Sequence, residues 1–224
     1  VYKRQATWNS LFTTALSALA AVIIGTVIAI ALDRTDIYGS SVLRLFLLSP
    51  LLVPPFIGAI AWIQLFGPNQ GLNKLFGFEI WNIYGADGVI ALMTIHSFPT
   101  AYVIISSSLR SISPDFELAA RVSGASVMTV LRTVPLPLLR PALLSAFTLT
   151  AIANLADFGI PAIIGSPARF ETLATMIYRF IDSGTVSNPL QVVSTIGVVL
   201  LFLGIGAVIM DYLTSLKNSS STHE

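Results

Sequence analysis

Five long apolar runs constrain this chain more than any other feature of its sequence. They occupy residues 8–32, 45–66, 88–109, 141–164 and 190–213. Each run provides the roughly 20 residues that an α-helix needs to cross about 30 Å of hydrocarbon. The bilayer core offers no water to unpaired backbone groups, so runs of this kind must cross as helices. The sequence therefore predicts an all-α polytopic membrane protein, with its transmembrane domain over residues 1–217.

The composition agrees with a membrane protein and narrows the range of partners. Of the 224 residues, 54% are hydrophobic and 10% are charged, whereas a soluble domain carries about 25% charged residues. Membrane lipid is therefore an expected partner. The net charge of +1 gives no argument for nucleic acid, and the absence of cysteine excludes disulfides and thiolate metal sites. Because the chain begins at Val1 and not at methionine, we expect it to be part of a longer protein.

The positive charges between the runs predict the orientation of the chain. If five spans alternate, one side of the membrane collects seven Lys and Arg residues and the other side collects five. The richer side consists of Arg34, Arg44, Arg110, Arg121, Arg132, Arg140 and Lys217. Since cytoplasmic loops are enriched in Lys and Arg, we expect the segment 113–136 and the C-terminus in the cytoplasm. The Ser-rich tail 218–224 is expected to be disordered. On the opposite side, apolar residues at helical spacing predict a short amphipathic helix over 170–180.

A polar interruption at 113–136 separates the third run from the fourth. Ser113 and Pro114 form an N-cap and first-turn pattern, and the acidic residues that follow suit the positive end of a helix. Gly124 interrupts the pattern, and a second apolar-periodic piece continues until a cluster of prolines. We predict two short helices joined near Gly124 at the membrane surface, where another protein can bind them. The alternative is an amphipathic loop that only rests on the lipid.

Prolines and polar residues inside the runs indicate a candidate substrate path. Pro54 and Pro55, with Pro50 close by, fall in the second run, where they predict a bent or broken helix of the kind that lines a path. In the fourth run, Asp157 is a candidate functional residue because an acid in the bilayer costs a few kcal/mol. An equal alternative is that Asp157 is hydrated at the outer interface or caps a loop. Asn154 lies three residues earlier, on the same helix face.

Motifs for enzymatic chemistry are missing from the sequence. GxxxxGK[ST], HExxH and GxSxG do not occur, so no nucleotide-binding loop, zinc-protease site or hydrolase nucleophile is expected. His96 lies in an otherwise apolar run and is expected to form a hydrogen bond between helices, not to bind a ligand. We therefore predict that the chain is not an enzyme.

Residues 117–141 resemble the EAA motif of the membrane subunits of binding-protein-dependent ABC importers. The family pattern is an acidic-Ala-Ala triplet, a Gly four residues later and a Leu-Pro pair before a new span. The residues carried over as the ATPase-coupling set are Glu117, Ala119, Ala120, Arg121, Gly124, Ala125 and Pro137. Leu118 replaces the acid of the triplet, and Glu117 precedes it by one position. The resemblance implies the five-helix core of the type I ABC importer permease fold, with 113–136 as its cytoplasmic coupling helix segment.

The same resemblance implies partners, location and substrate. Such a permease pairs with an ABC ATPase dimer, a second permease half and a periplasmic or lipid-anchored substrate-binding protein in the bacterial inner membrane. Neither a cofactor nor a metal site is implied. The stretch NLADFGIPAIIG is similar to the ferric-iron branch, in which two halves are often fused in one chain. Ferric iron is thus the favoured substrate, with thiamine, phosphonate, polyamine and sulfate-like solutes left open.

A secondary transporter driven by an ion gradient is the alternative from another class. Such proteins carry several intramembrane charges for ion coupling, whereas this chain has at most Asp157. In either class, the residues expected on the translocation path are Pro54, Pro55, Asn154 and Asp157.

Overall fold

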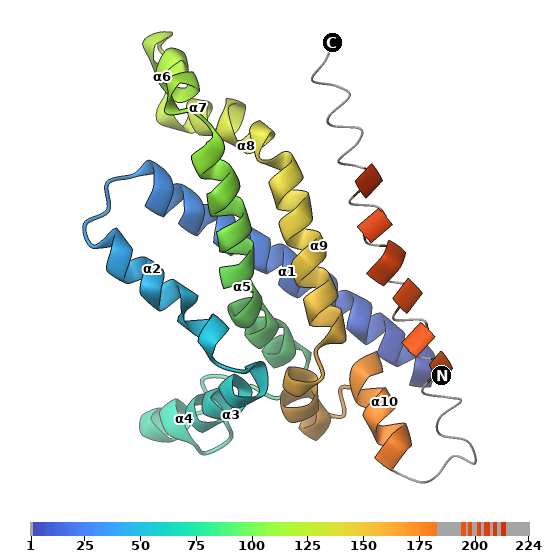
Figure 1. The fold of residues 1–224 in the computed structure, drawn as a ribbon. Coiled ribbons are helices and arrows are strands. Elements are labelled where there is room, and N and C mark those ends of the chain that lie inside the picture. Colours follow the sequence, from blue (N-terminus) through green and yellow to red (C-terminus); the bar gives the residue numbers. More distant parts are fainter. Residues whose placement is uncertain are drawn as a thin grey trace.

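The computed structural model describes residues 2–182 and short helical pieces at 194–195, 197–198, 201–202, 204–206, 208–209 and 212–213 (Figure 1). Apart from these pieces, the predicted fifth span at 190–213 and the tail 218–224 lie outside the described residues. Within the described part every regular element is a helix, as the apolar runs predict.

Three long helices form the frame of the molecule. α1 runs over Tyr2–Arg34, α5 over Ala86–Ser111 and α9 over Arg140–Ala156. The shorter elements between α1 and α5 are α2 (Ser40–Leu48), the 3₁₀ turn η1 (Ser49–Leu52), α3 (Pro55–Phe66) and α4 (Gly71–Phe76). Between α5 and α9 lie α6 (Pro114–Val122), α7 (Val127–Thr133) and α8 (Pro135–Leu138). After α9 come the π-helical turn η2 (Pro161–Gly165), η3 (Ser166–Ala168) and α10 (Leu173–Asp182).

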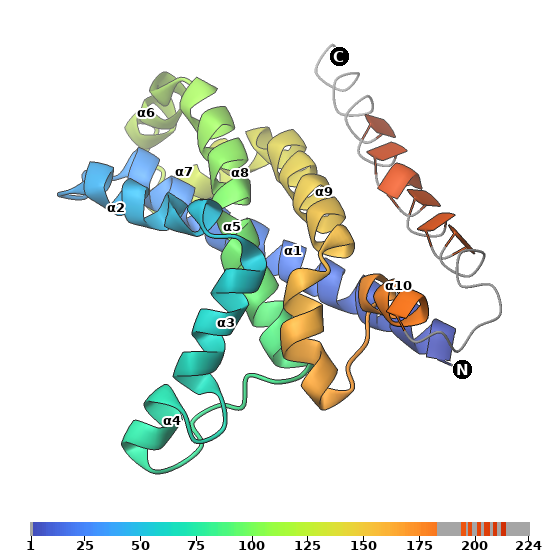
Figure 2. The same cartoon turned by 60° about the horizontal axis from the view of Figure 1, so that its bottom comes forward.

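The core is made by α1 packing along α5, with α9 against both (Figures 1 and 2). Small residues of α1 allow this close packing, as in other membrane helix pairs. Ala21 and Ala29 are fully buried, and Gly25 lies midway between them on the same face. A Cβ on Gly25 would come within 2.8 Å of the backbone nitrogen of Tyr102 on α5. The two helices therefore touch backbone to backbone at this point.

Two of the described helices are long and apolar enough to cross a membrane, Arg4–Arg34 and Ala86–Ser111. Two further pairs qualify only if each counts as one bent span, Ser40–Leu52 with Pro55–Phe76 and Val127–Leu138 with Arg140–Ala156. The described part thus provides up to four of the expected spans.

The predicted proline bend in the second run is confirmed. The helices before and after Pro54 meet at 105°, and Pro54 itself is in an extended conformation with ψ of 135°. Pro55 then occupies the first helical position of α3, where its missing N–H costs nothing. Pro99 has no such effect, because α5 continues through it from Ala86 to Ser111.

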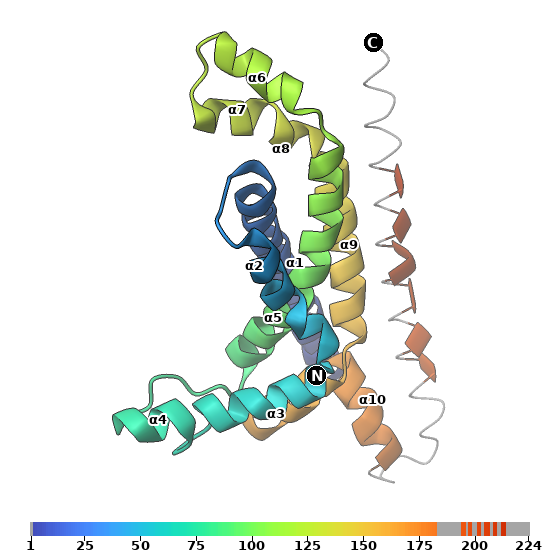
Figure 3. The same ribbon diagram turned by 60° about the vertical axis from the view of Figure 1, so that its left-hand side comes forward.

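The elements gather at two opposite ends of the frame. Figure 3 shows α6 and α7 as a hairpin that projects beyond one end of α5 and α9, while α3 and α4 extend sideways at the other end. The N-terminus and α10 lie at this second end (Figure 1). The amphipathic helix expected over 170–180 is present as α10, and its buried Leu173 and Met176 pack with Ala6 of α1.

Candidate functional site

The α6–α7 hairpin is built from local capping interactions. Ser113 caps α6 by accepting a hydrogen bond from the N–H of Asp115 at 3.3 Å. At the other end of α6, the N–H of Ala125 donates to the carbonyl of Ala120 at 3.2 Å. Gly124 has a φ of +87° in this turn, a conformation that costs residues with a side chain about 1–2 kcal/mol. The predicted break between two short helices near Gly124 is therefore present.

The hairpin exposes large apolar side chains. Val122 is 89% exposed and Phe116 is 60% exposed, and Leu118, Val127 and Met128 are exposed as well. Such a group of apolar side chains indicates a surface that binds protein or membrane. Of the predicted coupling residues other than Glu117, Ala119, Arg121 and Gly124 are exposed, while Ala120, Ala125 and Pro137 are half-buried.

Glu117 is engaged within the chain, unlike its neighbour Leu118. Arg34 Nε donates to Glu117 Oε1 at 2.7 Å, and the two side chains are 13% and 16% exposed. The Nη2 of the same guanidinium donates to the carbonyls of Leu109 at 2.7 Å and Ile112 at 3.1 Å. One side chain thus joins the ends of α1 and α5 to the first turn of α6. Where the family motif has its acid, this hairpin presents the apolar side chain of Leu118.

A second charged group lies directly beside this one. The Asp33 side chain is 2% exposed and accepts hydrogen bonds from Arg44 at 2.8 Å, Arg110 at 3.0 Å and Ser106 at 2.5 Å. Arg44 belongs to α2, and the other two donors belong to α5. The consecutive residues Asp33 and Arg34 therefore fasten α2, α5 and α6 to the end of α1.

A cavity of about 140 Å³ with a mixed apolar and polar lining lies among α3, α5 and α9. Its polar lining consists of His96, Ser97, Thr100, Thr150, Asn154 and Asp157. Pro55 also lines it, so three of the four predicted path residues meet at one place. The fourth, Pro54, precedes α3 as its N-cap residue and is absent from the described lining.

Hydrogen bonds hold the polar lining in place. Ser97 Oγ donates to Asn154 Oδ1 at 2.5 Å, and Asn154 Nδ2 donates to Ser17 Oγ at 2.8 Å. This chain of bonds links α5, α9 and α1 through uncharged groups. Asp157 accepts a hydrogen bond from the N–H of Gly159 at 2.8 Å directly after α9. Asp157 therefore caps the turn after α9 and lines the cavity as well.

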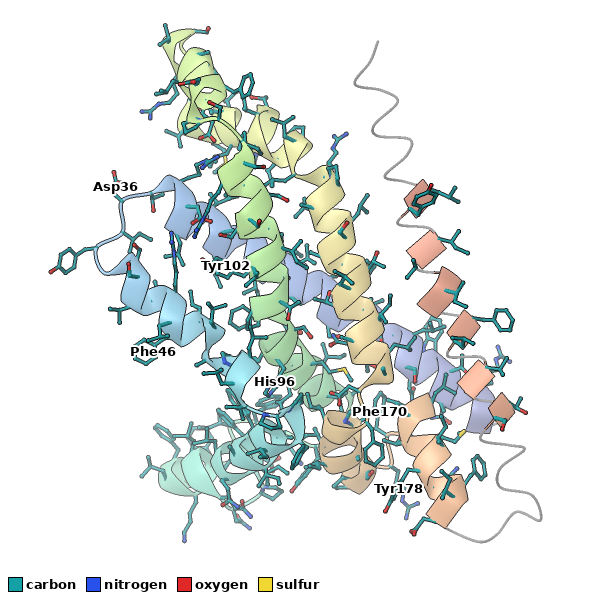
Figure 4. The ribbon with its side chains drawn as sticks, viewed as in Figure 1. Asp36, Phe46, His96, Tyr102, Phe170 and Tyr178 are labelled. Atoms are coloured by element: carbon teal, nitrogen blue, oxygen red, sulfur yellow. The ribbon has the colours of Figure 1, made fainter. Side chains whose placement is uncertain are left out.

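His96 faces the cavity from α5, beside the break between α2 and α3 (Figure 4). The backbone carbonyl of Pro50 accepts a hydrogen bond from the imidazole. The Nε2 atom is buried and has no partner among the described residues. Gly58 leaves room for it, since a Cβ at that position would clash with Nε2. The expected hydrogen bond from His96 to a neighbouring segment is therefore present, while the other ring nitrogen has no partner among the described residues.

Several residues of these sites cannot be identified from the sequence alone. Arg34 reads as one more positive charge at the end of a run, and its partner Glu117 lies 83 residues away. Ser17 and Ser97 are small polar residues in apolar helices, a signal that is common in membrane proteins. The one available signal is that Ser17, Ser97 and Asn154 are all polar in otherwise apolar runs.

Comparison with known proteins gives curated relatives from several transport systems. The putative ferric transport system permease protein FbpB 1 of Haemophilus influenzae is 27% identical over 92% of this chain and 33% of its own length. The putrescine transport system permease protein PotI of Escherichia coli K12 is 31% identical over 80% of this chain and 62% of its length. The putative molybdenum transport system permease protein YvgM of Bacillus subtilis is 29% identical over 76% of this chain and 77% of its own length. The chain spans about a third of the length of the ferric relatives it matches.

Solved structures with the same fold agree. The methionine ABC transporter MetNI matches with a TM-score of 0.71 at 20% identity, over 93% of this chain and 92% of that one. A bacterial ABC transporter for import of the acidic polysaccharide alginate matches with a TM-score of 0.77 at 16% identity, over 93% of this chain and 78% of that one. Residues 21–216 match the sequence model of one family. On these grounds the chain belongs to the binding-protein-dependent transport system inner membrane components.

Proposed function

We propose that this chain is the membrane-spanning half of an ATP-driven importer and that its α6–α7 hairpin docks on a separate ATPase. The observation that carries the proposal is the capped hairpin itself, which exposes Phe116, Leu118 and Val122 beyond the end of the long helices. Apolar side chains held on a rigid turn fit a groove in another protein. The EAA-like spacing of 117–141 supports the same assignment.

The proposed orientation places the hairpin in the cytoplasm and α10 at the outer face. The Lys and Arg bias favours this direction. A periplasmic or lipid-anchored binding protein would then deliver substrate near α10 and α3. A second permease half completes the path, either as another chain or as a fused half, and the roughly threefold greater length of the ferric relatives accommodates the fused arrangement.

Ferric iron is the proposed substrate, with a polyamine as the second choice. Two ferric permeases of about 27–28% identity cover 92% of the chain, and the NLADFGIPAIIG stretch supports them. The putrescine and molybdenum relatives name the competing solutes that an uptake assay must include.

The substitution Gly124→Asp tests the coupling role. An aspartate at a φ of +87° strains the turn between α6 and α7, by about 1–2 kcal/mol. We expect normal membrane insertion, with ATP hydrolysis by the assembled transporter uncoupled from uptake. Gly77→Asp is the matched control, because Gly77 ends α4 with a φ of +72° and equally open surroundings at the opposite end of the frame.

The measurements are co-purification of an ATPase with the tagged chain and ATP-dependent uptake by reconstituted vesicles. Uptake by Gly124→Asp at the level of Gly77→Asp would contradict the coupling role. Uptake that follows an imposed ion gradient without ATP would instead indicate a secondary transporter.

A further inference from the structure

The cavity among α3, α5 and α9 offers a solute more hydrogen-bond acceptors than donors, because most donors of its lining are bonded within the protein. Ser97 donates its hydroxyl proton to Asn154 Oδ1, and Thr150 donates to the carbonyls of Ala146 and Phe147 at 2.7 and 3.1 Å. A hydroxyl that donates inward keeps lone pairs free to accept. The donor capacity of the lining is thus largely used within the protein.

His96 adds another acceptor. Its hydrogen bond goes to the carbonyl of Pro50, which places the ring proton on that side. The buried Nε2, without a partner among the described residues, therefore carries a lone pair. Among the described polar groups of the lining, the Thr100 hydroxyl and the second Nδ2 proton of Asn154 are the donors that have no hydrogen bond in the structure.

The charge of the lining, like its hydrogen-bond acceptors, favours a positively charged solute. Asp157 is held by backbone N–H groups, and none of the ion pairs in the described part of the chain includes it. No Lys or Arg is found among the described residues that line the cavity. A carboxylate without a cationic partner at a membrane-embedded site favours a positive solute and repels an anion.

From these three observations we propose that the cavity is a transient binding site for a small cation on its way through the membrane. Asp157 supplies the charge, while His96 Nε2 and the Ser97 and Thr150 oxygens accept from, or coordinate, the cation. About 140 Å³ accommodates several water-sized groups. In the described part of the chain no three acidic or histidine side chains gather to hold a metal.

The proposal rests on the transport role proposed above and narrows its substrate class. Ferric iron and putrescine both satisfy it, whereas molybdate, sulfate or phosphonate do not. The chemistry shared by the first two solutes is positive charge, and the two are distinguished by which of them is bound and transported.

Direct binding to the purified full-length protein is the first test. Equilibrium dialysis is run with ferric ion from a freshly dissolved ferric salt, with putrescine and with molybdate, on the wild type, Asp157→Asn, His96→Gln and Asp182→Asn. Asp182 is the control because it is an exposed acid at the end of α10. We expect one of the two cations to bind, Asp157→Asn to weaken it at least tenfold, His96→Gln to weaken it severalfold, and Asp182→Asn to leave it unchanged.

Three results would overturn the proposal: neither cation binds the wild type, binding is equal in Asp157→Asn and Asp182→Asn, or molybdate is the solute that binds. His96→Gln keeps the test decisive if Asp157→Asn fails to accumulate, because unchanged binding in His96→Gln would then refute the site.

Uptake by the reconstituted assembly is the second test, with ATPase co-purification measured on the same samples. We expect Asp157→Asn to retain the ATPase and to lose at least tenfold in cation uptake. A wild-type chain that binds the cation but retains no ATPase would refute the proposed function alone. If the wild type and Asp157→Asn both retain the ATPase and import an oxyanion equally well, the cation site alone would be refuted.

Discussion

Removal of the Arg34–Glu117 contact should loosen the α6–α7 hairpin by a measurable amount. Exposed ion pairs contribute about 0–1 kcal/mol, whereas breaking a buried pair costs about 3–5 kcal/mol. The two side chains here are 13% and 16% exposed, so we expect Glu117→Gln to cost about 2 kcal/mol, between these limits. Arg34→Ala should cost more, because it also removes the donors to the carbonyls of Leu109 and Ile112.

Hydrogen exchange of the α6 amides is the assay. Because each 1.4 kcal/mol is a factor of ten, a loss of about 2 kcal/mol should speed exchange in α6 roughly 30-fold. Asp115→Asn is the control, since Asp115 is an exposed acid in the same helix turn. Equal α6 exchange in Glu117→Gln and Asp115→Asn would refute the view that the ion pair holds the hairpin. Exchange in α10, at the far end of the frame, should not change in any variant.

Two further substitutions test the frame that carries the hairpin. Asp33→Asn leaves Arg44 and Arg110 without their carboxylate, and we expect the free energy of unfolding to fall by about 3 kcal/mol. The variant should melt at a lower temperature than the control Asp36→Asn, whose side chain is exposed. Equal melting temperatures would contradict this prediction. Gly25→Ala would gain about 1 kcal/mol from helix propensity alone, but its Cβ would lie 2.8 Å from the Tyr102 nitrogen. We therefore expect the variant to unfold at a lower temperature than the wild type. A higher unfolding temperature would show that α1 and α5 separate easily.

Local sequence signals predict the helices of the segment 113–136 well. Ser113, Gly124 and the prolines after it determine where short helices begin and end, because capping and left-handed turns depend on a few neighbouring residues. The bend at Pro54 is predictable for the same reason, since a missing N–H acts at its own position. The angle of 105° between the two helices cannot be predicted in this way, because it depends on how the helices pack.

Contacts between distant segments are beyond sequence reasoning. The EAA resemblance suggests Glu117 for a contact with a partner, and within the chain its carboxylate pairs with Arg34, which lies 83 residues away in the sequence. The sequence predicts a hydrogen bond from His96 to another segment, which is present, but not that its Nε2 lies over the bare backbone of Gly58 without a partner in the described structure. Asp157 and Asn154 follow from burial cost and helical spacing, while Ser97 and Thr150 enter the cavity only through helix packing.

The backbone contact between α1 and α5 at Gly25 has a mechanical consequence. With no side chain between the two backbones at Gly25, neither helix can move closer to the other there, so a tilt of α1 has to take place about this contact. Because α1 has 33 residues, at 1.5 Å per residue it is about 50 Å long, and a tilt of about 10° displaces one of its ends relative to the other by about 9 Å. Arg34, which holds α6, lies at one end of this helix, and Ala6, on which α10 packs, lies near the other, so a tilt of α1 would shift the seats of α6 and α10 in opposite directions.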